Sequence, residues 1–200
     1  DLGATGVARK AVAVVQTNMV LGGGSEACTV RAIEALSPDY DVTLITFSNV
    51  DSEELNDSYG SEIAGENLKI ISPPLPQWLK QNRRFSMLKG HLMMRYCKSV
   101  NADFDLFVGV GGGMDFGRRG IQYGAYAPAS TLMKVLSHDR SLPWWYYLSK
   151  KSMTRFCESI SGFSGDSLKS NVTLATSRWI GQQMEEMYSI HDFEIVYPPV

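Results

Sequence analysis

The sequence predicts an α/β fold with a doubly wound, mostly parallel sheet and helices on both faces. Two observations support this prediction. Apolar runs of strand length recur along the chain, and segments with helical spacing separate them. Runs that are apolar on both faces are typical of parallel strands buried between helix layers.

Five apolar runs are predicted to form strands, and a short final strand is expected in "FEIVYPPV" at the end of the chain. The five runs are "AVAVVQ" (11–16), "DVTLITFS" (41–48), "NLKIIS" (67–72), "FDLFVGV" (104–110) and "VTLATS" (172–177).

Helical spacing predicts four helices between these strands. The first carries Ala27, Val30, Ile33 and Leu36 near one face, and Pro38 follows its end. The others are expected over 77–102, 144–160 and 178–190, with Gly90 bending or dividing the long 77–102 segment.

Composition restricts the classes of function. The chain has 200 residues, of which 44% are hydrophobic, and this length suits one domain. The formal net charge of −2 gives no overall basic field, so we expect no nucleic-acid partner.

Three cysteines without C-x-x-C spacing argue against both a disulfide framework and a zinc site. No apolar run approaches the roughly 20 residues of a membrane span, and the first residues lack the apolar core of a signal peptide. We therefore expect a cytoplasmic protein.

A glycine-rich turn, Gly22–Gly24, separates the first predicted strand from the first helix. Glycines allow a ligand or another group to come close to the backbone. The N-terminus of a following helix presents free N–H groups to an anion. The turn formally fits the dinucleotide fingerprint, but two features disfavour a nicotinamide cofactor. "TNMVL" precedes the turn, and Phe47 and Ser48 stand where an acidic ribose ligand is expected after the second strand. Phosphate or substrate binding and a simple tight turn both remain open.

At these residues the sequence resembles family 4 glycosyltransferases. "GGGSEACTVRAIEALSPDYDVTLITF" is similar to that family's GG-x-E loop, first helix and second strand, and "VTLATSRWIGQQMEEMYSIHDFEIVYPPV" to its NS-x-W strand, helix and VYPPV ending. The resemblance spans Lys10 to Val200. It implies a Rossmann-like, acceptor-side N-terminal domain over residues 1–200, which is one half of a GT-B enzyme whose donor-binding domain is absent from this chain.

The resemblance further implies transfer of a sugar from a nucleotide-sugar donor to a glycan or lipid-linked acceptor, with retention of configuration. It implies no metal and no cofactor, and an inactive isolated domain. It places Gly22, Gly23 and Gly24 at the cleft near the donor phosphates, with Glu26 behind them. Glu26 also fits a favourable charge in the first helical turn, and both interpretations stay open.

The segment "RRGIQYGAYAPAS" (119–130) resembles a family stretch whose histidine lies beside the transferred sugar. Ala125 stands at that histidine's position, so the catalytic group is unknown. A natural variant, a domain without activity and an engineered substitution all remain open. Gln122, Tyr123 and Tyr126 are candidates for the acceptor pocket, although core positions are equally compatible with them.

A second glycine-rich turn, "GVGGGMDFGRRG" (109–120), also follows a predicted strand, and we expect it at the same edge of the sheet as the first. Asp115, Arg118 and Arg119 follow this turn. Asp115 is a candidate acceptor ligand.

The segment 77–102 has six cationic and no acidic residues. One interpretation is a solvated face over a core stripe that includes Trp78 and Phe85. The other is docking of a peripheral enzyme to an anionic membrane surface, with Lys80, Arg83 and Arg84 as membrane-facing candidates.

The function predicted from the sequence is therefore sugar transfer. The alternative is a non-catalytic Rossmann-like module that binds an anionic ligand, which the alanine at position 125 supports.

Overall fold

The computed structural model describes residues 8–19, 22–65, 68–82, 85–124 and 144–198. They form a seven-stranded sheet in the order β3-β2-β1-β4-β5-β6-β7. All neighbouring strands in it are parallel. The predicted doubly wound α/β fold is thereby confirmed.

The strands are β1 (Ala11–Val15), β2 (Asp41–Ile45), β3 (Leu68–Ile71), β4 (Leu106–Val110), β5 (Ile121–Gly124), β6 (Val172–Ala175) and β7 (Glu194–Ile195). The sequence predicted all of these except β5. The central strands β1 and β4 are mostly buried, whereas both residues of β7 are exposed.

The described helices are α1 (Gly24–Leu36), α2 (Ser52–Tyr59), α3 (Gln77–Gln81), α4 (Ser86–Ser99), α6 (Trp144–Ser161), α7 (Gly165–Lys169) and α8 (Arg178–Tyr188). None of the helices in the described ranges has both the length and the apolar character that a membrane crossing requires.

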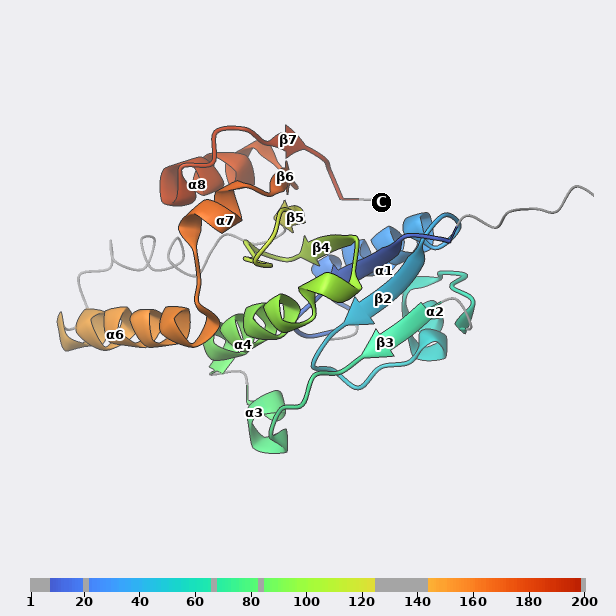
Figure 1. Ribbon diagram of the computed structural model, residues 1–200, viewed down its shortest axis with the longest axis horizontal. Helices are drawn as coiled ribbons and strands as arrows, with labels where there is room; N and C mark the ends of the chain where they lie inside the picture. Colours follow the sequence, from blue (N-terminus) through green and yellow to red (C-terminus); the bar gives the residue numbers. More distant parts are fainter. Residues whose placement is uncertain (1–7, 20–21, 66–67, 83–84, 125–143, 199–200) are drawn as a thin grey trace, which may run out of the picture.

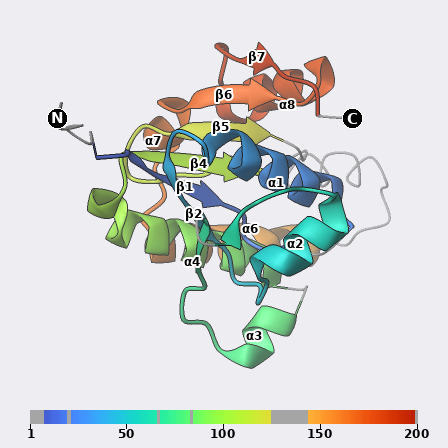
Figure 2. The same cartoon turned by 90° about the vertical axis from the view of Figure 1, so that its right-hand side faces the viewer.

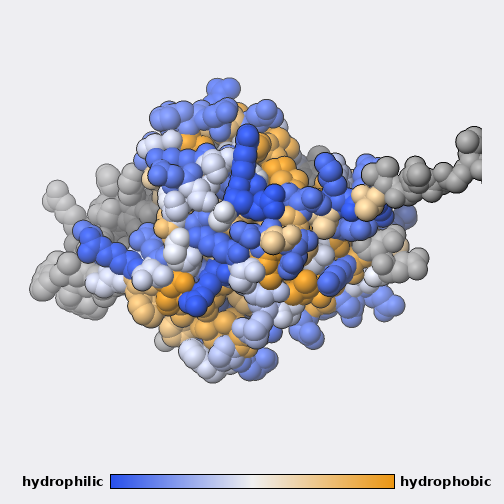
Figure 3. Space-filling model, in the orientation of Figure 1, coloured by the Kyte–Doolittle hydropathy of each residue, from blue (hydrophilic) through white to orange (hydrophobic). Residues whose placement is uncertain are grey.

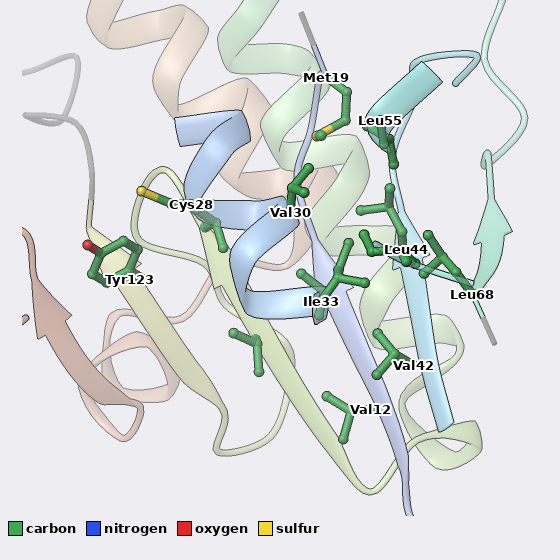
Figure 4. Close-up of a cluster of buried hydrophobic side chains, with 14 residues drawn as sticks. Val12, Met19, Cys28, Val30, Ile33, Val42, Leu44, Leu55, Leu68 and Tyr123 are labelled. Atoms are coloured by element: carbon green, nitrogen blue, oxygen red, sulfur yellow. The ribbon is translucent and has the colours of Figure 1, made fainter. Parts of the chain in front are cut away.

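Helices α1 and α2 cover one face of the sheet, and α4 covers the other (Figures 1 and 2). The core on the α1 side contains Val30, Ile33 and Leu44, and Tyr123 of β5 closes it beside Cys28 (Figure 4). The core on the α4 side contains Met93, Cys97, Phe107 and Phe116. Burial of apolar area in these two layers is the main driving force for the fold.

The segment 77–102 is divided, but not at the predicted glycine. Asn82 has an extended backbone and ends α3, and α4 starts at Ser86. Gly90 lies inside α4. Unlike a proline, a glycine keeps its backbone N–H, so it lowers helix stability without forcing a break.

Helix α2 was not predicted, because its eight residues carry little apolar periodicity. Local capping accounts for it. Asp51 Oδ1 accepts a hydrogen bond from the Glu54 amide at 2.9 Å, and Gly60 ends the helix at φ 59°.

The order of the strands reverses next to β1. The chain first adds β2 and β3 on one side of β1, and then crosses through α4 to place β4 on the other side. In open α/β sheets, ligands bind outside the carboxyl ends of the strands at such a switch point.

Candidate functional site

A cavity of about 600 Å³ lies at this switch point, outside the carboxyl ends of β1 and β4. Its walls come from the loop after β1, the glycine turn after β4, and the first half of α4. The polar residues of the first wall are Gln16, Thr17 and Asn18. The volume falls in the range typical of small-molecule sites, about 300–1,000 Å³.

Backbone hydrogen bonds hold the loop after β1 against the loop after β2. The Phe47 amide donates to Thr17 O at 3.1 Å, and the Met19 amide donates to Ser48 Oγ at 2.8 Å. Ser48 also lines the cavity. The polar wall is therefore built on two neighbouring strands.

The side chain of Glu26, from the first turn of α1, covers the first glycine turn. Gly22 has φ 91°, which favours glycine, and its amide donates to Tyr59 Oη at 3.0 Å. A Cβ at Gly23 would overlap the carboxylate of Glu26, whereas a Cβ at Gly24 would meet nothing within 4 Å. The group that approaches this backbone so closely is thus the Glu26 side chain.

The surroundings of Glu26 fit a favourable charge in the first helical turn, and its active-site role stays a prediction. Its side chain is buried, accepts a hydrogen bond from Ser25 Oγ at 2.7 Å, and lies over the N-terminus of α1, where a negative charge is favourable. Gln16 Nε2 donates to the same Ser25 hydroxyl at 3.2 Å. Glu26 also lines the cavity, whereas Gly22, Gly23 and Gly24 are not among its lining residues.

The second glycine turn opens onto the cavity. Gly111, Gly112 and Gly113 line it, and the Gly111 amide donates to Tyr123 O at 3.0 Å. Gly111 has φ 107°, and a Cβ at Gly112 would meet nothing within 4 Å. The prediction that both turns lie at one edge of the sheet is confirmed by their positions after β1 and β4.

Asp115 is fully buried away from the cavity. Its Oδ2 accepts from Lys98 Nζ at 2.6 Å and from the Ser164 amide at 2.7 Å, and its Oδ1 accepts from the Gly117 amide at 2.8 Å. Burial acts to raise the pKa of this carboxyl, but the bonds from Lys98, Ser167 and the two amides outweigh it and hold the pKa below its usual range. Because both oxygens are enclosed by protein groups, Asp115 is not part of the cavity site.

The arginines after the second turn also lie outside the cavity. Arg118 donates to the carbonyl groups of Asn101, Phe104 and Asp105, so it fastens the turn to the start of β4. Arg119 is exposed near the amino ends of β5 and β6, at the opposite edge of the sheet.

Gln122 and Tyr123 are core residues of the sheet in this structure. Gln122 Nε2 donates to Thr173 Oγ1 at 2.7 Å, and Tyr123 Oη donates to Val196 O at 3.0 Å. Burial raises the pKa of Tyr123 to about 12. Neither side chain lines the cavity, and the predicted positions Ala125 and Tyr126 lie outside the described residues.

The basic segment fits a solvated face over a core stripe only in part. Leu92 and Tyr96, which continue the stripe of Trp78 and Phe85, pack against the core. Lys89 is 3% exposed and lines the cavity, while Trp78 of the expected core stripe is 61% exposed. Figure 3 shows the face that carries α4, with hydrophobic residues gathered along its lower part. Lys80 also lines the cavity, and Arg83 and Arg84 lie outside the described residues.

The sequence interpretation did not name four of the residues that line the cavity as site residues, namely Gln16, Asn18, Lys89 and Gly90. Gln16 and Asn18 had a usable signal, since they directly follow the first strand at its carboxyl end. Lys89 and Gly90 were recognised only as parts of a basic helix. In the described ranges, no three His, Cys, Asp or Glu side chains come together as a metal site.

No protein-family model and no curated protein matches this chain. Among solved structures, the chain is similar to HepE from Anabaena, determined in complex with UDP and glucose, with a TM-score of 0.50 at 8% sequence identity. The match covers 96% of this chain and 45% of the HepE chain. The chain therefore has a Rossmann-like fold similar to part of HepE, and it spans slightly less than half of the HepE chain's length.

Proposed function

We propose that this chain is the N-terminal, acceptor-side domain of a GT-B glycosyltransferase that transfers a sugar from a nucleotide donor to a glycan or lipid-linked acceptor. The observation that carries the proposal is the cavity of about 600 Å³ at the β1/β4 switch point. Its polar wall and open glycine turn suit a sugar, whose hydroxyl groups require many hydrogen-bonding partners.

The likeness to HepE supports the donor class, because that protein is seen with UDP and glucose. In the proposed enzyme, a second domain supplies most donor contacts. We place the turn at Gly22–Gly24 on the donor side of the cleft. Because Glu26 covers the start of α1 and the Gly22 amide donates to Tyr59, the charge of the leaving group is stabilised chiefly by the second domain.

Retention of configuration belongs to the same proposal, as does transfer without a metal or cofactor. With alanine at position 125, transfer relies on positioning and electrostatic stabilisation rather than on an imidazole. Peripheral binding to an anionic membrane and a cytoplasmic location remain predictions. The exposed Trp78, next to Lys80 on α3, supports membrane binding.

The test is sugar transfer by the protein translated from the complete reading frame, assayed against a panel of nucleotide sugars and acceptors. Gly112→Trp directs a large side chain toward the cavity from a position where an added Cβ meets no neighbour within 4 Å. We expect this variant to lose transfer at least about 100-fold, because displacing a substrate from a near-attack geometry removes several kcal/mol of transition-state stabilisation.

The matched control is Gly165→Trp, since Gly165 also has an open Cβ position and is exposed away from the cavity. Equal loss in both variants would contradict the placement of the site. A wild-type protein that binds UDP or an anionic ligand but transfers no sugar would support the non-catalytic binding module instead. In an active enzyme, Ala125→His tests whether that position is a disabled catalytic one.

A further inference from the structure

A lysine forms part of the wall of the cavity. Lys89 is 3% exposed, and its Nζ donates to Asn18 Oδ1 and to the carbonyl oxygen of Lys80, at 3.2 Å each. Asn18 and Lys80 line the same cavity. Lys89 therefore brings a positive charge to the wall of the cavity.

The charge of the lining is positive on balance. Among the described residues that line the cavity, Lys80 and Lys89 are cationic and Glu26 is the one acidic residue. The Glu26 carboxylate is directed back to Ser25 Oγ and the start of its own helix, where the helix dipole compensates its charge. On the α3 and α4 side of the described lining, both charged residues are thus lysines.

The rest of the lining suits a polar ligand of sugar size. Gln16, Gln81 and Ser86 supply amide and hydroxyl groups, and the turn Gly111–Gly113 exposes backbone. Gly90 on α4 has no neighbour within 4 Å of its Cβ position, so the absence of a side chain there keeps the space open.

We propose that this cavity selects an acceptor that carries an anionic group, a carboxylate or a phosphate, next to the sugar that receives the transferred residue. Lys89 is the specificity-determining residue, and Lys80 adds a second positive charge. This inference rests on the proposed transferase function. We assign the anionic group to the acceptor rather than to the donor. The turn expected to face the donor diphosphate, Gly22–Gly24, is not among the residues that line the cavity.

The test compares acceptors that differ only in charge. Transfer by the full-length enzyme is measured with a glucuronate-terminated, a glucose 6-phosphate-terminated and a glucose-terminated acceptor. The wild type is expected to prefer a charged acceptor by at least about 10-fold in kcat/KM, and the first two acceptors distinguish carboxylate from phosphate. Lys89→Met is expected to remove most of this preference through KM, and Lys89→Arg to retain part of it.

A second variant guards against misfolding at the buried lysine. Gln81→Glu adds a negative charge at an exposed position of the cavity lining, and its matched control, Gln182→Glu, adds the same charge on the exposed side of α8. We expect Gln81→Glu to raise KM for charged acceptors at least about threefold, with a smaller effect at high salt, and Gln182→Glu to leave it unchanged.

The inference is overturned if the wild type prefers the neutral acceptor, or if Gln81→Glu and Lys89→Met affect charged and neutral acceptors equally. If no acceptor is used with any donor, the proposed transferase function fails. Binding of glucuronate, glucose 6-phosphate and glucose to the same protein, followed by NMR, then tests the cavity alone. Weaker binding of the two anions in Gln81→Glu supports the site, and no difference between anions and glucose rejects it.

Discussion

The two glycine-rich turns have the same pattern in sequence and different structures. In each, three consecutive glycines follow a strand, and a buried carboxylate stands two residues after the last glycine, Glu26 in one case and Asp115 in the other. Glu26 folds back over Gly23 and lines the cavity. Asp115 pairs with Lys98 and does not line the cavity, whereas the three glycines before it do.

The difference shows that a glycine run alone does not identify a ligand contact. In the first turn, the missing Cβ makes room for the protein's own carboxylate. In the second, no protein group fills the space at Gly112, and the space belongs to the cavity. Four substitutions test this comparison.

The largest effect is expected at the anchor of the second turn. Asp115→Ala leaves the Lys98 ammonium and two backbone amides without their carboxylate. We expect the free energy of unfolding to fall by about 3 kcal/mol, the lower end for a broken buried pair, because Lys98 is 22% exposed and can reach water. Chemical denaturation measures the change.

The control is the double variant Asp115→Leu with Lys98→Met, which removes both charges and should be more stable than Asp115→Ala. An equally unstable double variant would show that the loss does not come from the unpaired charge.

The same carboxylate predicts a pH dependence. Because the folded-state pKa of Asp115 is depressed, its contribution is complete above the unfolded pKa, about 3.9, and is lost as the pH falls through the folded value. The free energy of unfolding of the wild type, measured from pH 5 to pH 2, should fall more steeply than that of Asp115→Asn. Parallel curves would contradict the assignment.

A smaller effect is expected at the first turn. Gly23→Ala places a methyl group on the Glu26 carboxylate and expels it from the start of α1, which should cost about 1–2 kcal/mol. In a Glu26→Ala background the same substitution should cost much less. An equal cost in both backgrounds, measured by thermal unfolding, would show that Glu26 does not explain this glycine.

Gly90→Ala should stabilise the protein by about 0.5–1 kcal/mol, because alanine is the better helix former and its Cβ meets nothing within 4 Å. The methyl group also enters the cavity, so acceptor KM should rise while the melting temperature increases. A stabilised variant with unchanged KM would place the acceptor elsewhere.

The smallest effect is expected for Gly112→Ala, the counterpart of Gly23→Ala in the second turn. Its Cβ meets no neighbour within 4 Å, so the free energy of unfolding should change by less than about 0.5 kcal/mol. A cost as large as that of Gly23→Ala, in the same denaturation assay, would remove the distinction between the two turns.

The sequence predicted the layers of the fold well, because a strand such as β1 is buried on both faces and therefore has a simple apolar pattern. Helix α2 escaped prediction since caps, not periodicity, define it. The break after Asn82 escaped it since no proline or glycine marks that position.

The cavity was harder to predict than the fold. The topology predicted the edge of the sheet at which the cavity lies. The burial of Lys89, in contrast, depends on how α3 and α4 meet, which no local sequence pattern encodes. Asp115 was a reasonable candidate ligand by position, and its pairing with Lys98 arises from contacts between α4 and the 162–164 loop.

The central place of β1 also affects how the chain folds during synthesis. Its partner β4 lies far along the chain, and the Ala11 amide and the Asp105 carboxylate that join their ends are 94 residues apart in sequence. At bacterial or eukaryotic translation rates, these residues emerge roughly 5–20 s apart. During that time one side of β1 has no strand beside it, so the nascent chain offers an open, apolar strand edge that is prone to aggregation. Chaperone dependence while residues 11–105 are being synthesised is therefore expected from the strand order alone.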